Sequence, residues 1–216
     1  MPVHGQVDEQ PGVQEAVASY DKAIRTSLSS WLDARISNAR LGFEYRITEK
    51  AYLRHGLGYY FKLGFREEPS GLLDMNGFSL HTAYRWLTPR RNSFNDNDMP
   101  YFEVSLMYRY LDIDVAGDFT RASGNFSQRI NYTIWENSYG WSATAGQLFY
   151  IGKRLRLDLY IGIGILLVRQ KFSAIPEGAL FRTNGGSTVW DYEPGETTTE
   201  ARPILPVGLS FMYVLE

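Results

Sequence analysis

Alternation of apolar and polar residues is the feature that most constrains how this chain can fold. From about residue 22 onward the sequence repeats with a period of two, which is the repeat of a β-strand with one apolar face. Residues 155–166 show the pattern most clearly, because Leu or Ile occupies every odd position from Leu155 to Ile165 while Arg156 and Asp158 take even ones. Few stretches with a helical repeat compete with it. The sequence therefore predicts an all-β fold.

Eight segments carry this alternation. They are residues 22–32, 39–47, 52–65, 78–87, 101–110, 140–151, 155–166 and 205–215. The first alternates weakly, and the sixth changes phase near Gly146, where we expect a β-bulge. Segments of roughly ten to fourteen residues are long for a soluble sheet, in which about five or six are typical. They match the roughly 9 to 11 residues of a tilted strand that crosses a membrane, plus some protrusion.

The connections between these segments alternate in length. Thr48–Lys50 and Gly152–Arg154 are tight turns, whereas Arg66–Asn76, Ala116–Ser138 and Phe172–Arg202 are long. Short turns at one rim and long loops at the other are typical of bacterial outer-membrane barrels. We therefore expect an eight-stranded antiparallel up-and-down transmembrane β-barrel, with strands five and six extending above the membrane.

Alternation alone leaves two orientations open. A lipocalin-type soluble barrel would turn the apolar stripe inward, and a membrane barrel would turn it outward. The polar stripe is rich in glycine, which suits a narrow lumen but would weaken strands that face water; these glycines are Gly42, Gly56, Gly58, Gly64, Gly162, Gly164 and Gly208. The apolar stripe gathers aromatic residues near strand ends, as interfacial girdles do; they are Tyr45, Trp86, Tyr108, Tyr110, Phe211 and Tyr213. Both features favour the membrane orientation.

Charges of both signs fall on the polar stripe, and the membrane orientation places them in the lumen. The predicted lumen charges are Arg40, Glu44, Arg46, Arg54, Lys62, Arg85, Glu103, Arg109, Arg156 and Asp158. One interpretation is a salt-bridged filling that acids from loops or the N-terminus complete. The other is an anion-selective path or a pocket for an acidic ligand. We favour the filling, because the bore of eight strands is normally filled and an unpaired buried charge costs several kcal/mol.

Composition excludes several classes of function. The chain has 22 Lys and Arg, 24 Asp and Glu and a net charge of -2, which argues against nucleic-acid binding through bulk positive charge. It has no cysteine, which excludes a disulfide scaffold, a thiolate metal site and a Cys nucleophile. The three histidines are His4, His55 and His81. We therefore expect no cofactor, no metal site and no nucleic-acid partner.

The ends of the chain bear on localisation. The longest apolar run, Leu159–Val168, is about half of the roughly 20 residues that a membrane-spanning helix needs. The first residues have no apolar signal region, so the chain is either a non-exported protein or the mature part of an exported one. Since the strand pattern predicts an outer-membrane barrel, we expect the mature form without its signal peptide. Residues 1–21 are polar and predict a periplasmic lead-in, either a short helix or disordered. Residues 22–216 predict the barrel.

Several stretches resemble small outer-membrane β-barrel proteins of Bacteroidetes. They are AIRTSLSSWLDARISNARLGFEYRITEKAYLRHGLGYYF near the start, GFSLHTAYRWL and YFEVSLMYRYL in the middle, and GQLFYIGKRLRLDLYIGIGI toward the end. The resemblance covers roughly residues 23–215. It implies an eight-stranded barrel like OmpA, OmpX or OmpW in the bacterial outer membrane, in contact with outer-membrane lipid and lipopolysaccharide.

Function is less constrained than fold. Small barrels can be lipid-modifying enzymes, which need a His paired with a Ser and an acid. We expect His55 to face lipid and His81 to be a structural residue of the lumen, so no catalytic residue is predicted. Trp190, Tyr192 and Tyr132 are candidate contacts in the long loops. The prediction is a non-enzymatic barrel with a structural or accessory role, partnered by a larger outer-membrane complex. The alternatives are a narrow transporter for small hydrophobic or acidic solutes and a lipid-modifying enzyme.

Overall fold

The computed structural model describes residues 20–28, 37–62, 72–88, 98–121, 127–173, 179–181 and 197–215. Within these residues all regular structure is β-strand, and no helix there is long and apolar enough to cross a membrane. The strands are β1 (Lys22–Ser27), β2 (Asn38–Arg46), β3 (Ala51–Phe61), β4 (Leu72–Leu87), β5 (Asp98–Arg121), β6 (Ser127–Tyr150), β7 (Leu155–Phe172), β8 (Ala179–Phe181), β9 (Thr198–Ile204) and β10 (Val207–Leu215).

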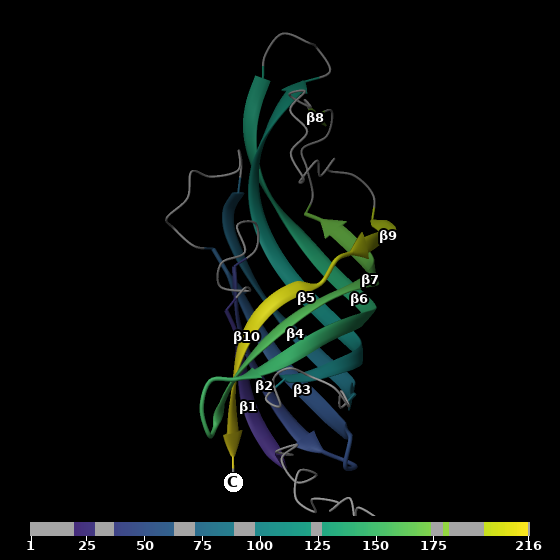
Figure 1. Cartoon of the computed structure of the whole chain (residues 1–216). Helices are drawn as coiled ribbons and strands as arrows, with labels where there is room; N and C mark the ends of the chain where they lie inside the picture. The colour runs from purple at the N-terminus through teal and green to yellow at the C-terminus, as the bar shows by residue number, and fades with distance from the viewer. Residues whose placement is uncertain are drawn as a thin grey trace, which may run out of the picture.

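The strands close into an antiparallel ring (Figure 1). Each of β1 to β6 pairs with the next strand along the chain, β10 pairs with β1, and β7 pairs with β10 to complete the circle. β9 continues β10 after a break at Leu205 and Pro206, and both pair with β7 in one unbroken register. Pro206 has no N–H to donate to the ladder, which accounts for the break. β9 and β10 together form the eighth strand of the barrel wall, and we call these eight wall strands the staves. The predicted eight-stranded up-and-down barrel is therefore confirmed.

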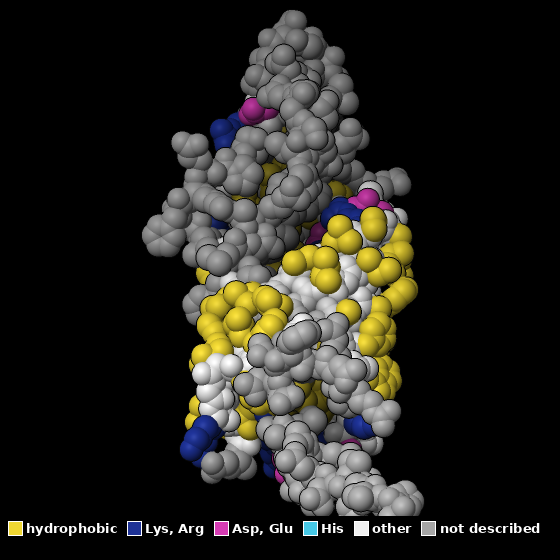
Figure 2. Space-filling view, viewed as in Figure 1, with side chains coloured by type: hydrophobic (Ala, Val, Ile, Leu, Met, Phe, Trp, Pro, Cys, Tyr) yellow, Lys and Arg dark blue, Asp and Glu magenta, His cyan; other side chains and the backbone are white. Residues whose placement is uncertain are grey.

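The apolar stripe lies on the outside of the ring. Ile161 and Leu106 are 63% and 65% exposed, whereas Arg156 and Asp158 on the alternate positions of β7 are buried. Figure 2 shows hydrophobic side chains over the middle of the visible face, with Lys and Arg nearer the two ends. The chain therefore has the orientation of a membrane barrel, and the lipocalin-type alternative is wrong.

Aromatic side chains bound the apolar belt at both ends. Tyr45, Trp86, Phe102 and Tyr213 lie toward the end with the tight turns, which we call the lower end. Tyr59, Phe78, Tyr108 and Tyr139 lie toward the other, where the Tyr59 hydroxyl donates to Asn76 Oδ1 at 3.2 Å and the Tyr108 hydroxyl to Asn137 Oδ1 at 2.9 Å. Phe78 and Trp86 are eight positions apart on β4, which gives about 20 Å of height for a strand tilted by about 40°.

β5 and β6 form a hairpin that rises far above the other staves (Figure 1). Each is 24 residues long, and they pair without a break from Asp98↔Phe149 to Thr120↔Ser127. The predicted extension above the belt is therefore present, but most of the expected loop Ala116–Ser138 is strand. The short strand β8 pairs with β5 near the tip of the hairpin.

Other boundaries differ from the prediction. The expected bulge near Gly146 is absent from the described β5–β6 and β6–β7 ladders, because Gln147 stays on the outer face and Leu148 turns into the lumen, where it is fully buried. β1 ends at Ser27, before the predicted residue 32. β7 runs on to Phe172, and β9 takes part of the expected loop Phe172–Arg202.

Candidate functional site

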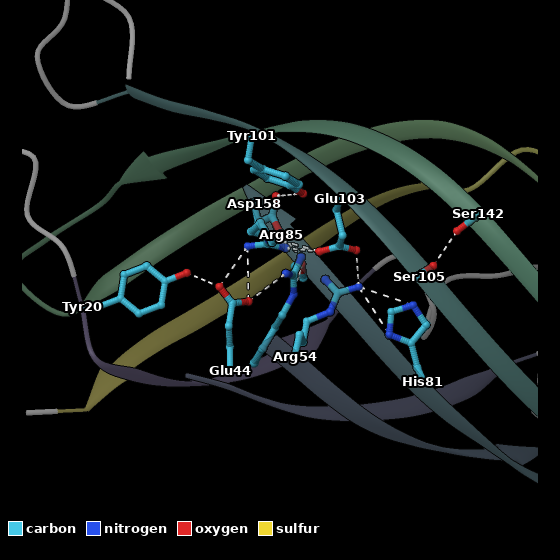
Figure 3. A network of polar contacts seen from close by, with 12 residues as sticks. Tyr20, Glu44, Arg54, His81, Arg85, Tyr101, Glu103, Ser105, Ser142 and Asp158 are labelled. Atoms are coloured by element: carbon cyan, nitrogen blue, oxygen red, sulfur yellow. Dashed lines mark hydrogen bonds and ion pairs between the residues drawn. The ribbon is translucent and has the colours of Figure 1, made fainter. Parts of the chain in front are cut away.

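Arg85 of β4 is the centre of an ion-paired network in the lower lumen (Figure 3). Its Nε and Nη2 donate to Glu103 Oε2 at 3.0 and 2.9 Å, and its Nη2 also donates to Asp158 Oδ2 at 3.2 Å. Its Nη1 lies 3.3 Å from Glu44 Oε2. One guanidinium therefore joins carboxylates from β2, β5 and β7, which are staves from different parts of the ring.

Two further arginines complete the charge balance of this network. Arg25 of β1 donates through Nη2 to Asp158 Oδ2, and through Nη2 and Nε to Ser210 Oγ at 2.6 and 3.0 Å. Arg54 of β3 contacts Glu103 Oε1 through Nη2 at 2.5 Å. We call these residues the lumen network; they are Arg25, Glu44, Arg54, Arg85, Glu103 and Asp158.

Aromatic residues lie beneath and around the lumen network. The Tyr20 hydroxyl donates to Glu44 Oε1, and the Tyr101 hydroxyl donates to Asp158 Oδ1 at 2.7 Å. Tyr20 stacks on Tyr52 with ring centroids 4.4 Å apart, and the Arg156 guanidinium lies over the Tyr20 ring at 4.4 Å. These rings remove the charges from water and fill the lower end of the lumen.

The chemistry of this arrangement is structural. Arg85, Glu44 and Asp158 are all fully buried, and each carboxylate contacts at least one guanidinium. Buried charges persist in a protein when they are paired and hydrogen-bonded, and removing one partner typically costs about 3–5 kcal/mol. The lumen network thus closes the lower lumen and connects staves across it.

A second polar layer lies higher in the barrel, around Glu136 of β6. Arg109 Nη2 contacts Glu136 Oε1 at 2.5 Å, Ser138 Oγ donates to Oε1 at 3.0 Å, and Gln170 Nε2 donates to Oε2 at 3.1 Å. Arg202 Nη1 of β9 lies 3.8 Å from the same carboxylate. We call this layer the upper network.

Above the upper network the interior becomes apolar. A buried cluster, which we call the apical cluster, consists of Tyr60, Met75, Leu111, Ile113, Phe119, Tyr132 and Ile134. Most of its members come from the rising part of β5 and β6, so these residues explain why the hairpin stays paired there. The described lumen is therefore layered, with aromatic, ionic, polar and apolar levels from bottom to top.

A cavity of about 450 Å³ lies between the lumen network and the upper network. Arg40, Arg54 and His81 line one part of it, and Ser105 and Ser142, whose Oγ atoms are 2.7 Å apart, line another. Figure 3 places His81 and this serine pair beside the upper edge of the lumen network.

The structure brings together most, but not all, of the predicted lumen charges. Glu44, Arg54, Arg85, Glu103, Arg156 and Asp158 gather in the lower lumen, and Arg109 belongs to the upper network. Arg40 lines the cavity. Arg46 lies at the lower rim, 34% exposed and paired with Asp21. Lys62 lies just beyond β3, where it donates to the backbone oxygens of Leu72 and Leu73 at 3.1 and 2.9 Å. Arg46 and Lys62 therefore lie at the two rims of the lumen, apart from the buried charges.

Of the three candidate contacts in the loops, the structure describes Tyr132. Tyr132 is only 5% exposed and packs in the apical cluster, with its ring 5.9 Å from that of Phe119. Burial raises the pKa of Tyr132 to about 12, so the phenol is neutral at physiological pH. The prediction of Tyr132 as an exposed contact is therefore wrong. Trp190 and Tyr192 lie outside the described residues.

Three site residues escaped the sequence analysis. Arg25 alternates with Ile24 and Thr26, so its parity was a usable signal in a weakly patterned segment. Glu136 shares its parity with Ser138 and Ser142 but fell in an expected loop. Tyr20 fell in the expected lead-in, although it precedes β1 directly and hydrogen-bonds the lumen network.

The two strand histidines have simple surroundings. His55 is exposed on the outer face, with its Nδ1 3.1 Å from Thr82 Oγ1. His81 points inward beside Arg54, whose Nη2 is 3.4 Å from His81 Nδ1. Among the described residues, no group of three or more His, Cys, Asp and Glu could hold a metal ion.

Fold and site together define an eight-stranded β-barrel with a charged, filled lumen. No protein-family model matches the chain, and no curated protein does so. Among solved structures the chain is similar to Neisserial surface protein A (NspA), with 12% sequence identity and a TM-score of 0.44 over 90% of this chain and 94% of that chain. The description as a barrel depends on the strand register of this chain itself.

Proposed function

We propose that this protein is a bacterial outer-membrane β-barrel. One observation carries the proposal: large apolar side chains face outward around the ring while ion-paired charges are buried inside it. Water disfavours so large an exposed apolar surface. A bilayer favours it, because lipid solvates the apolar side chains and a closed ring leaves no unpaired edge in the hydrocarbon region. The aromatic girdles then lie at the two headgroup levels.

We propose that the lower end of the barrel faces the periplasm. Ile47–Lys50 and Ile151–Arg154 connect strands at the lower end by short turns, which outer-membrane barrels keep in the periplasm. The β5–β6 hairpin then projects outside the cell. Residues 1–21 are proposed as a periplasmic lead-in, with Tyr20 as its anchor in the barrel.

We propose that the chain belongs with the small outer-membrane barrels like OmpA, OmpX and OmpW, and that it is of the type found in Bacteroidetes. The strand motifs quoted above support both. Lipopolysaccharide and outer-membrane lipid are the proposed surroundings of the apolar belt.

We propose a non-enzymatic role in interaction with a partner, with the hairpin as the element that projects. Ten residues of β5, Asp112–Arg121, continue beyond the upper aromatic girdle, which corresponds to about 30 Å of strand. The apical cluster stiffens this projection, and the lumen network closes the barrel beneath it. A rigid projection on a closed barrel suits presentation of a surface to a larger outer-membrane complex. The contacts of His55 with Thr82 and of His81 with Arg54 differ from a Ser–His–acid arrangement.

A narrow transporter for small hydrophobic or acidic solutes is the second candidate. The cavity beside Arg40 and Arg54 favours it. The lumen network opposes it, because a solute leaving the cavity downward would have to separate buried ion pairs.

Removal of the hairpin tests the interaction role. A variant in which an Asn-Gly turn replaces residues 114–133 can keep the pair Ile113↔Ile134 and the whole belt, so we expect it to reach the outer membrane and to migrate as a heat-modifiable barrel. In-cell cross-linking and purification in mild detergent should recover a larger complex with the full chain and lose it with this variant. Recovery of the same complex with both proteins would reject the hairpin as the contact. Solute flux into vesicles with the full chain would instead favour the transporter.

A further inference from the structure

We propose that the cavity in the middle of the lumen is a binding site for a small amphiphilic anion, whose carboxylate or phosphate group is held by Arg40 and Arg54. The inference goes beyond the proposed role of the hairpin, since it concerns the interior of the barrel. It depends on the charge balance of the lumen, on unpartnered polar atoms that line the cavity, and on the apolar residues that complete its wall.

Arg40 is the first observation. Its backbone oxygen accepts a hydrogen bond from Thr26 Oγ1 at 3.0 Å, but its guanidinium forms no ion pair or hydrogen bond with any part of the chain that the structure describes. Its Nε is buried and lacks a hydrogen-bond partner. The three arginines of the lumen network, by contrast, each contact a carboxylate. Arg40 is therefore a cation at the cavity wall whose counter-charge the described lumen does not supply.

The charges of the lumen network balance one another, so Arg40 adds positive charge beside it. The three carboxylates Glu44, Glu103 and Asp158 are engaged by Arg25, Arg54 and Arg85. A smaller cavity of about 50 Å³ is lined by Arg25, Arg40 and Arg54 together, and Arg40 and Arg54 also line the large cavity. The positive charge of Arg40 thus lies where there is space for a ligand.

Hydroxyl groups face these arginines from other staves. Thr144 of β6 is only 5% exposed and lines the cavity, and its Oγ1 has no hydrogen-bond partner among the described residues. The Ser105 and Ser142 hydroxyls line the same space. A buried hydroxyl without a partner is uncommon, because leaving it unpaired is unfavourable. An anionic oxygen is an acceptor suited to the two donors that lack one, the Thr144 hydroxyl and the Arg40 guanidinium.

The rest of the lining is mixed. Met107 and the β9–β10 junction, Ile204–Val207, form an apolar part, and the Glu103 carboxylate, which is ion-paired with Arg54 and Arg85, lies on the polar side with Ser27, Asn38 and Tyr160. A volume of about 450 Å³ lies within the range of small-molecule sites, which is roughly 300–1,000 Å³. The site therefore fits a molecule with one anionic group and a short hydrocarbon portion, and it fits a bare inorganic ion less well.

Binding of octanoate to the full barrel in neutral lipid nanodiscs tests this inference. Carbonyl-labelled octanoate, observed by carbon NMR, should bind saturably, while 1-octanol should not compete. Inorganic phosphate should compete weakly, because it lacks the hydrocarbon portion; competition as strong as that of unlabelled octanoate would show that the site takes a free phosphate and would overturn the amphiphilic ligand. Arg40→Gln should weaken octanoate binding by about tenfold or more, Arg40→Lys by less, and Thr144→Val by about threefold to tenfold.

Arg46→Gln is the matched control, because it removes an arginine at the lower rim, outside the cavity. It should leave octanoate binding unchanged, and each variant should keep the heat-modifiable migration of a folded barrel. If Arg40→Gln fails to fold, Thr144→Val carries the test, because it keeps every charge. Absence of saturable binding, equal binding of 1-octanol, or binding that neither substitution weakens would overturn the inference. Any of these results would leave the outer-membrane placement intact, since the assay starts from a folded barrel.

Discussion

Arg85 and Glu103 lie directly opposite each other on β4 and β5, and Arg85 donates to one oxygen of Glu103 from both Nε and Nη2, at 3.0 and 2.9 Å. The pair is a cross-strand contact within the barrel wall and also the centre of the lumen network. Local sheet pairing and closure of the lumen therefore depend on the same two side chains.

Arg85→Met should destabilise the barrel strongly. It leaves Glu44, Glu103 and Asp158 buried with fewer cations, which typically costs about 3–5 kcal/mol. Urea unfolding in lipid vesicles, followed by heat-modifiable migration, measures the loss. Arg46→Met is the control, because the Arg46–Asp21 pair is exposed at the rim and is expected to contribute less than about 1 kcal/mol. Equal losses for the two variants would show that the lumen network does not stabilise the barrel.

Gly208→Ala should be destabilising despite the small size of the change. Gly208 lies opposite Tyr160, and a Cβ atom at residue 208 would meet the Tyr160 ring. Overpacking of this kind typically costs about 1–3 kcal/mol. The same unfolding assay measures the effect, and Tyr160→Ala in the same chain should remove most of the penalty of Gly208→Ala. Gly152→Ala is the control, because nothing lies within 4 Å of a Cβ there. A neutral Gly208→Ala would contradict the close contact.

Tyr132→Ala should loosen the hairpin while leaving the belt intact. The substitution removes a ring from the apical cluster, and loss of a buried aromatic side chain typically costs about 3–5 kcal/mol. Because β5 beyond Val115 and β6 before Ile134 pair only with each other and with β8 among the described residues, the loss should appear as local opening. Limited proteolysis should cut within residues 112–136 faster than in the unmodified chain, and the fragment that remains in the membrane should still be heat-modifiable. Unchanged cutting would show that the ring does not hold the hairpin closed.

Leu106→Arg places a charge on the outer face at the level of the apolar belt. A charged side chain near the middle of a bilayer costs about 2–4 kcal/mol in a barrel, so the variant should fold less stably in vesicles. Asp118→Arg, on the exposed face of the upper hairpin, should change stability by less than about 0.5 kcal/mol. If both substitutions are tolerated equally, Leu106 does not face lipid.

Period-two alternation specified much of the fold and part of the site. It placed Glu44, Arg85, Glu103 and Asp158 on the inner face, because a strand fixes the face of each residue once the phase is known. It does not fix height, which is why Arg46 and Lys62 were assigned to the lumen although they lie at its rims.

The alternation also could not predict which side chains meet across the lumen. The approach of Arg85 to Asp158 depends on how far the strands are staggered when the ring closes, and no local pattern encodes that stagger. Glu136 was missed because the alternation of β6 was assumed to stop at the membrane surface. The unpaired guanidinium of Arg40 could be recognised only after every other partner in the lumen had been assigned.

A single-cysteine scan along β7, from Arg156 to Ile165, tests the central claim most directly, because the chain has no native cysteine. A nitroxide label at each position, in lipid vesicles, reports accessibility to oxygen, which concentrates in lipid, and to a water-soluble nickel chelate. We expect the oxygen accessibility of the label to vary with a period of two along β7. Odd positions such as Ile161 and Ile163 should be accessible to oxygen, and even positions such as Asp158 should be shielded from both reagents. High oxygen accessibility at the even positions, or high accessibility to the nickel chelate at the odd ones, would contradict it.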